Sequence, residues 1–145
     1  MLLNRMVDIM GGKQVIKQPV HNTLDFLHLS QKEQLSIEAI RSIQRLMKFT
    51  NKEMSEMLSI SESTLQRRYN SLVPLSKDEA EKAFHITKVI ARGMEVYGSL
   101  DDFLRFLHAN SRALGNIKPI EIMSSSIGRD EILNLLGRIE WGMYS

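Results

Sequence analysis

Apolar side chains in this chain recur at steps of three and four residues, which places them on one face of an α-helix. The alternation of apolar and polar residues that is typical of strands is almost absent. Only three prolines, Pro19, Pro74 and Pro119, interrupt the helical spacing. The sequence therefore predicts an all-α fold.

The longest predicted helix begins at the capping-box pattern Ser76-x-x-Glu79 and ends at Gly98. Its apolar positions hold helical spacing over about five turns, so they are expected to form one buried face. The residues of that face are Ala80, Ala83, Phe84, Thr87, Ile90, Ala91, Met94 and Tyr97.

Three segments are expected along the chain. Residues 1–21 form an N-terminal arm, in which a short helix over 2–10 is stopped by Gly11-Gly12 and an extended basic stretch covers 13–17. Residues 22–72 form a first helical domain, and the break at Val73-Pro74-Leu75 separates it from a second helical domain over 73–145. Serines at positions 99 and 124–126 are expected to cap helices of this second domain.

Several function classes are disfavoured by composition. There is no cysteine, so disulfides and thiolate metal sites are excluded, and the four histidines lack metal-ligand spacing. No apolar run approaches the length of a membrane helix, and no signal-peptide pattern opens the chain, so cytoplasmic residence is expected. No motif places a nucleophile beside a His–acid pair, so we expect neither an enzyme nor a cofactor.

Residues 50–68 have the pattern of a helix-turn-helix. A first helix is expected over 52–58, a tight turn over Ser59-Ile60-Ser61, and a second helix from Glu62, with Leu65 as its buried residue. The front half is mildly basic, with 10 Lys and Arg against 7 Asp and Glu in residues 1–72, as a DNA-binding surface requires. A plain helical hairpin with a polar outer face is the alternative interpretation.

The outward-facing side chains of this segment suit DNA. Arg pairs with guanine through two hydrogen bonds, and Ser and Thr bond bases or phosphates. Base readout is assigned to Ser63, Thr64 and Arg67, while the backbone around Ser61 can hold a phosphate. Phosphate contacts are assigned to Thr50, Lys52, Gln66 and Arg68.

Two stretches carry a resemblance to a known family. One is Asn-Lys-Glu-Met at 51–54 followed by Ser-Glu-Ser-Thr-Leu-Gln-Arg-Arg at 61–68, and the other is the ending Leu-Leu-Gly-Arg-Ile-Glu-Trp-Gly-Met-Tyr-Ser at 135–145. In these stretches the chain resembles the Xre/MbcA/ParS antitoxins of the RES–Xre type II toxin–antitoxin systems. The resemblance implies an N-terminal helix-turn-helix bundle of the Xre/Cro type and a C-terminal toxin-binding domain over 73–145.

The resemblance also implies partners. The toxin would be a RES-domain enzyme that consumes NAD⁺, and the C-terminal end of the antitoxin would cover its active site. Operator DNA, usually palindromic, would be bound by a homodimer or by a hetero-oligomer with toxin, so that the operon is repressed by its own product.

The last residues are chemically suited to that contact. Trp141 and Tyr144 offer flat apolar faces with one polar tip each, Gly142 allows a bend, and the terminal carboxylate can pair with arginines. The expected toxin-binding set is Arg138, Glu140, Trp141, Gly142, Met143, Tyr144 and Ser145, with Arg138 and Glu140 fixing the register. In the alternative interpretation, Trp141 and Tyr144 simply close the core.

Three functions thus remain open at this point. The first is an antitoxin and autorepressor. The second is a stand-alone transcriptional regulator that uses its C-terminal half to dimerise. The third is a protein-interaction module whose helix-turn-helix no longer binds DNA.

Overall fold

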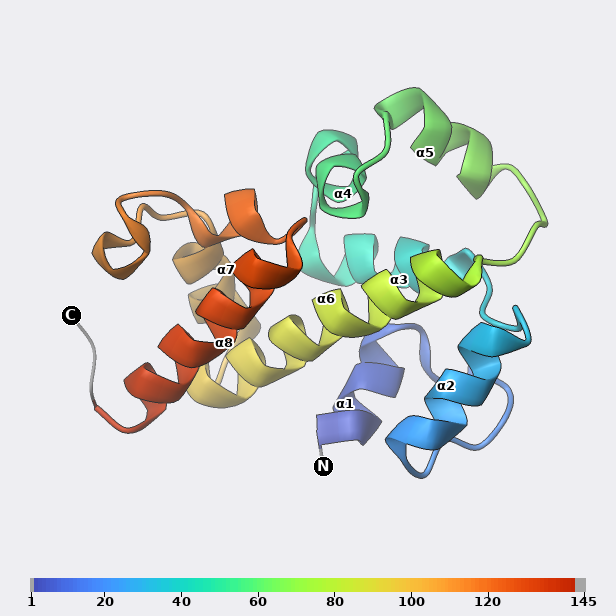
Figure 1. The fold of residues 1–145 in the computed structure, drawn as a ribbon, viewed down its shortest axis with the longest axis horizontal. Helices are drawn as coiled ribbons and strands as arrows, with labels where there is room; N and C mark the ends of the chain where they lie inside the picture. The colour runs from blue at the N-terminus through green and yellow to red at the C-terminus, as the bar shows by residue number, and fades with distance from the viewer. Residues whose placement is uncertain (1, 143–145) are drawn as a thin grey trace. The chain divides into compact units, whose positions relative to one another are not determined.

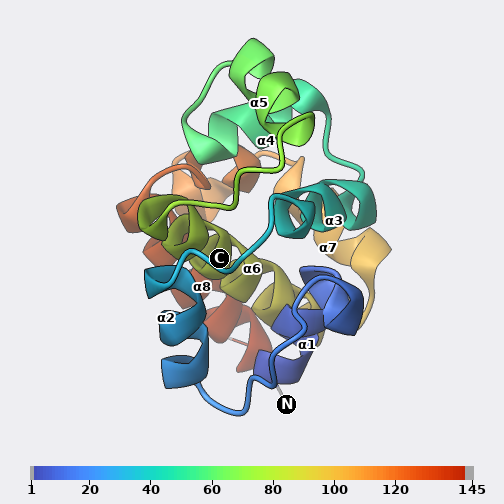
Figure 2. The same cartoon turned by 90° about the vertical axis from the view of Figure 1, so that its right-hand side faces the viewer.

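The computed structural model describes residues 2–142, and this part of the chain holds helices and no strand (Figure 1, Figure 2). One isolated β-bridge pairs Ser111 with Ile117. The all-α prediction is therefore confirmed. The chain divides into two compact units, which meet between residues 88 and 89.

The first unit contains the N-terminal helices. They are α1 (Leu2–Ile9), η1 (Gly12–Gln14), α2 (Thr23–Gln31), α3 (Glu38–Met47), α4 (Asn51–Leu58), α5 (Glu62–Tyr69) and the first part of α6 (Lys77–Tyr97). The one-sided spacing of α3 buries Ile40, Ile43 and Met47 completely, while Arg45 stays exposed. Burial of that stripe fixes which face of α3 points inward.

The segment after α1 is not the extended arm that the sequence suggested. Gly11 and Gly12 both have positive φ angles, of 114° and 66°, and turn the chain into the short 3₁₀ helix η1. This reversal buries Met10 and Ile16, which are 0% and 4% exposed. An extended arm would have left Ile16 in water, so its burial favours the turn.

The boundary of the first unit also differs from the expectation. The break at Pro74 does end α5, but α6 supplies residues up to 88 to the first unit. The backbone N–H of Leu75 donates to the carbonyl of Leu35 at 2.8 Å, and the rings of Phe26 and Phe84 lie 4.7 Å apart. The first turns of α6 are thus part of the core around the helix-turn-helix.

The second unit is built from the rest of α6 and the C-terminal helices. These are α7 (Leu100–Leu107), η2 (Arg112–Leu114), η3 (Pro119–Ile122) and α8 (Ser126–Glu140). As predicted, Ser99 and Ser125 cap α7 and α8, since their hydroxyls accept from Asp102 N–H and Gly128 N–H.

Two glycines let helices of the second unit approach closely. A side chain on Gly93 of α6 would collide with the ring of Phe103, and a side chain on Gly128 of α8 would collide with the backbone oxygen of Ile122. The aromatic ring can move, whereas a backbone carbonyl cannot without shifting η3. Gly137, also in α8, has no neighbour within 4 Å of the position of an added Cβ.

This contrast gives a stability prediction. Gly128→Ala should lower the free energy of unfolding by about 1–3 kcal/mol through overpacking. Gly137→Ala should raise it by about 0.5–1 kcal/mol, because alanine is the better helix former where space is open. Urea denaturation of both variants beside the unmodified chain checks the pair. Equal effects of the two substitutions would contradict the close approach of α8 to η3.

Candidate functional sites

The α4–α5 segment of the first unit forms a helix-turn-helix whose ends are defined by hydroxyl caps. Thr50 accepts from the Glu53 N–H at 3.0 Å, and the Glu53 carboxylate accepts from the Thr50 N–H at 2.9 Å. The turn needs Ser59 in the left-handed region, at φ 59°, and Ser61 then caps α5 by accepting from Thr64 N–H. Leu65 is fully buried, as predicted. Both views show α4 and α5 side by side (Figure 1, Figure 2).

Most of the residues predicted to contact DNA line the exposed side of this segment. Thr64 is half-buried, and its hydroxyl accepts from the Ser61 hydroxyl at 2.9 Å. The exposed members are Thr50, Lys52, Ser61, Ser63, Gln66 and Arg67. The hydroxyls of Thr50 and Ser61 serve as caps, so their first structural role is to shape the helix starts.

Arg68 differs from the other predicted contacts. Its guanidinium donates to Glu79 Oε1 at 2.8 Å and to the Pro74 carbonyl at 3.4 Å, and its side chain is only 18% exposed. The same Glu79 oxygen accepts from the Ser76 N–H at the start of α6. Arg68 therefore ties the end of α5 to the start of α6.

Sequence reasoning missed a second tie, between α3 and α5. The Tyr69 hydroxyl donates to Gln44 Oε1 at 2.5 Å, and Arg41 donates to the Tyr69 carbonyl at 2.7 Å while its guanidinium lies 4.4 Å from the ring centroid. Burial raises the pKa of Tyr69 to about 12, against the opposing effect of the Arg41 charge. The spacing of 25 residues between Gln44 and Tyr69 gave no local signal for this contact.

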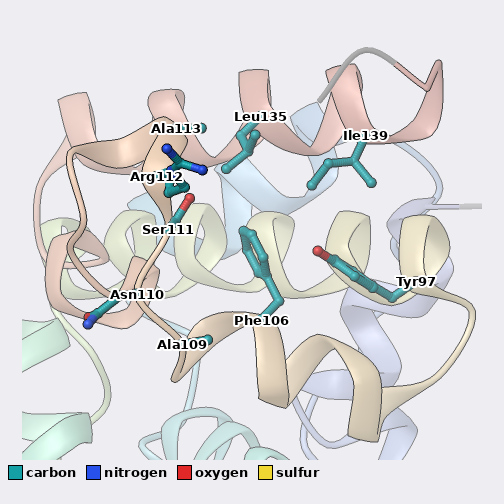
Figure 3. A pocket seen from close by; sticks show the side chains of 9 residues that line it. All are labelled: Tyr97, Phe106, Ala109, Asn110, Ser111, Arg112, Ala113, Leu135 and Ile139. Carbon is teal, nitrogen blue, oxygen red and sulfur yellow. The ribbon is translucent and has the colours of Figure 1, made fainter. Parts of the chain in front are cut away.

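The second unit contains an open groove of about 650 Å³ (Figure 3). Its apolar wall combines Tyr97 and Phe106, whose ring centroids are 5.3 Å apart, with Leu135 and Ile139 of α8. Arg112 lies at the polar end, where the loop after α7 lines the groove. Burial raises the pKa of Tyr97, and the charge of Asp102 acts in the same direction.

The end of α8 presents part of the expected toxin-binding set. Arg138 is exposed, Trp141 is 77% exposed, and Gly142 has a φ of 75°. Trp141 therefore does not close the core of the unit. Met143, Tyr144 and Ser145 lie outside the described residues.

Glu140 is held by a partner on α6. Arg92 donates two hydrogen bonds to its carboxylate, at 2.5 and 3.1 Å, and a third to Glu95 at 3.3 Å. The hydrogen bond and charge of Arg92 lower the pKa of Glu140. This fork fixes the last turn of α8 immediately before Trp141.

No helix within residues 2–142 is long and apolar enough to cross a membrane. No group of three or more His, Cys, Asp or Glu side chains in that range is arranged to hold a metal ion.

Comparison with known proteins decides the family. Residues 26–88 match the family model of the antitoxin Xre-like helix-turn-helix domain, and residues 92–142 match that of the antitoxin Xre/MbcA/ParS C-terminal toxin-binding domain. The chain belongs to the Xre-type antitoxins. Antitoxin Xre of Photorhabdus laumondii subsp. laumondii is 23% identical to this antitoxin over 114 residues, which cover 78% of this chain and 77% of the relative. Each family match falls within one compact unit of this antitoxin.

The Arg92–Glu140 fork predicts a pH effect in this antitoxin. Because the folded-state pKa of Glu140 lies below its ordinary value of 4.5, the pair contributes to stability above pH 4.5, and that contribution is lost as the pH falls through the folded value. In Arg92→Ala the Glu140 pKa should return toward 4.5, as followed by NMR of its carboxyl carbon. Glu95→Gln is the control and should leave the low pKa in place. An unchanged pKa in Arg92→Ala would contradict the fork.

Proposed function

We propose that this chain is the antitoxin of a type II toxin–antitoxin system in which it neutralises a RES-domain toxin that consumes NAD⁺ and represses its own operon. The observation that carries the proposal is the exposed, polar outer face of a capped helix-turn-helix in the same chain as an exposed Trp141 after α8. The family membership supports the general role. The resemblance described above supports the RES partner.

The DNA-binding role is assigned to α5. Its first turn presents Ser63, and Arg67 follows one turn later on the exposed side. We assign base readout to Ser63, Thr64 and Arg67, as in helix-turn-helix proteins whose second helix enters the major groove. The unpaired N–H groups at the starts of α4 and α5, with Lys52, can hold flanking phosphates.

Arg68 is left out of that interface. Its cation is neutralised by Glu79, and moving it to a phosphate would leave the carboxylate without its partner. A palindromic operator read by two copies of α5, one helical turn apart, is the arrangement that fits a single short readout helix.

Operator readout is tested with Arg67→Ala. The variant should lose about 1–3 kcal/mol of preference for the DNA upstream of its own gene over a random duplex, because a two-hydrogen-bond contact to one base is removed. Fluorescence anisotropy with both duplexes measures this preference. Arg5→Ala is the matched control, since Arg5 is an exposed arginine of α1 in the same unit. An unchanged preference in Arg67→Ala would refute the assignment.

Toxin binding is assigned to the end of α8. Trp141 is 77% exposed and so is accessible to a partner, and tryptophan is among the residues that most often dominate binding energy. Glu140 is oriented by Arg92 and so acts by positioning this end, while Arg138 remains exposed for direct contact. Leu135 and Ile139 of the same helix line the groove of the second unit.

Deletion of residues 141–145 tests this role. The shortened chain should fold, because α8 ends at Glu140, yet fail to restore growth when it is co-expressed with the RES-domain protein encoded beside it. Trp141→Ala should weaken the complex by about 2 kcal/mol or more in calorimetry. Leu24→Ala is the matched control, because Leu24 is a 62% exposed apolar residue of the first unit. Full neutralisation by the shortened chain would overturn the assignment.

A further inference from the structure

A basic pocket lies in the first unit where the end of α3, the start of α4 and the outer side of α5 meet. Its volume is about 440 Å³. Three cations and three amides line it, with no carboxylate among them. The polar lining residues are Arg41, Gln44, Arg45, Lys48, Asn51 and Gln66.

Two of the three cations have no competing acid. Arg41 is engaged, since it pairs with Glu38 at 3.0 Å and donates to the Tyr69 carbonyl. Arg45 and Lys48 are exposed, and within the described range of the chain neither forms an ion pair. Their charges are therefore available to a ligand at the pocket.

One amide of the pocket orients another. Gln44 donates through Nε2 to the Asn51 Oδ1 at 2.9 Å and to the Phe49 carbonyl at 3.1 Å. Because the Asn51 oxygen is occupied by this bond, the NH₂ group of Asn51 is its remaining polar group. Gln66 adds a second amide from the exposed side of α5.

Cations and amide donors without a carboxylate select an oxyanion. We propose that the basic pocket binds a backbone phosphate of the duplex whose bases α5 reads. The proposal rests on the DNA-binding role above and extends it to residues of α3. Gln66 connects the pocket with the readout surface, because it lines the pocket and belongs to α5. A phosphate held here is next to the groove that α5 enters.

The test is the salt dependence of binding, because each phosphate neutralised by a protein cation contributes about −0.9 to the slope of log Kobs against log salt concentration. The double variant Arg45→Gln, Lys48→Gln should flatten that slope by about 0.9 unit, as expected for the loss of one neutralised phosphate. The loss should be the same on the upstream DNA and on a random duplex, since a phosphate carries no sequence information. Circular dichroism checks that the pocket variant and its two control variants keep the fold.

Two control variants separate the position of the charges from their number. Lys17→Gln, Lys32→Gln removes two exposed cations elsewhere in the unit and should leave the slope within about 0.5 unit of the unmodified chain. Arg45→Lys, Lys48→Arg keeps both charges in the pocket and should preserve the slope. An unchanged slope in the pocket variant, or an equal loss in the Lys17 and Lys32 variant, overturns the proposal.

The readout and the pocket fail in different ways. If the unmodified chain binds both duplexes equally, operator readout fails, while the slope on the random duplex still decides the pocket. If the preference for upstream DNA is intact and the pocket variant keeps the slope of the unmodified chain, the pocket alone is refuted.

Discussion

The carboxylate of Glu79 holds the end of α5 against the start of α6, and the helix-turn-helix of the first unit depends on this contact. Its Oε1 accepts from the N–H of Ser76, directly before α6, and from the guanidinium of Arg68, in the last turn of α5. The Arg68 Nε is buried without a hydrogen-bond partner, so this cation depends on Glu79 for its neutralisation. One side chain thereby couples the orientation of the readout helix to the start of the longest helix of the chain.

A second anchor acts on the other side of α5. Tyr69 and Gln44 link it to α3 through a hydrogen bond of 2.5 Å, and burial of the phenol raises the pKa of Tyr69 to about 12. With Leu65 buried between these anchors, only the polar side of α5 remains for a ligand. Rigid placement of such side chains limits the entropy that is lost when they bind.

Local signals predicted the helices well, because hydroxyl caps act within three or four residues. The caps at Ser76, Ser99 and Ser125 were predicted in this way, and so was the burial of Leu65. The buried face of α6 was predicted only in part. Ile86 and Val89 are completely buried, yet a single stripe omits them, because this helix contributes to two units and is covered on more than one side.

Contacts between distant residues were beyond the reach of sequence patterns. Arg68, which was predicted to contact DNA, instead pairs with Glu79 and is mostly buried. The Arg92–Glu140 fork joins residues 48 positions apart. Both arginines sit on helix faces that the periodicity marks as polar, and polarity does not tell whether a cation faces water or a carboxylate. The same ambiguity hid the basic pocket, whose members come from three helices.

The proposed DNA interface separates affinity from specificity in space. In it, cations at the end of α3 would supply attraction that any duplex satisfies, whereas the hydroxyls and Arg67 of α5 would supply contacts that depend on base identity. Such a division would let a chain with a net charge of only +2 bind DNA, because local charge rather than the total sets the field at the phosphates. Substitutions in α5 can then alter the preferred operator while the electrostatic part of the binding is kept.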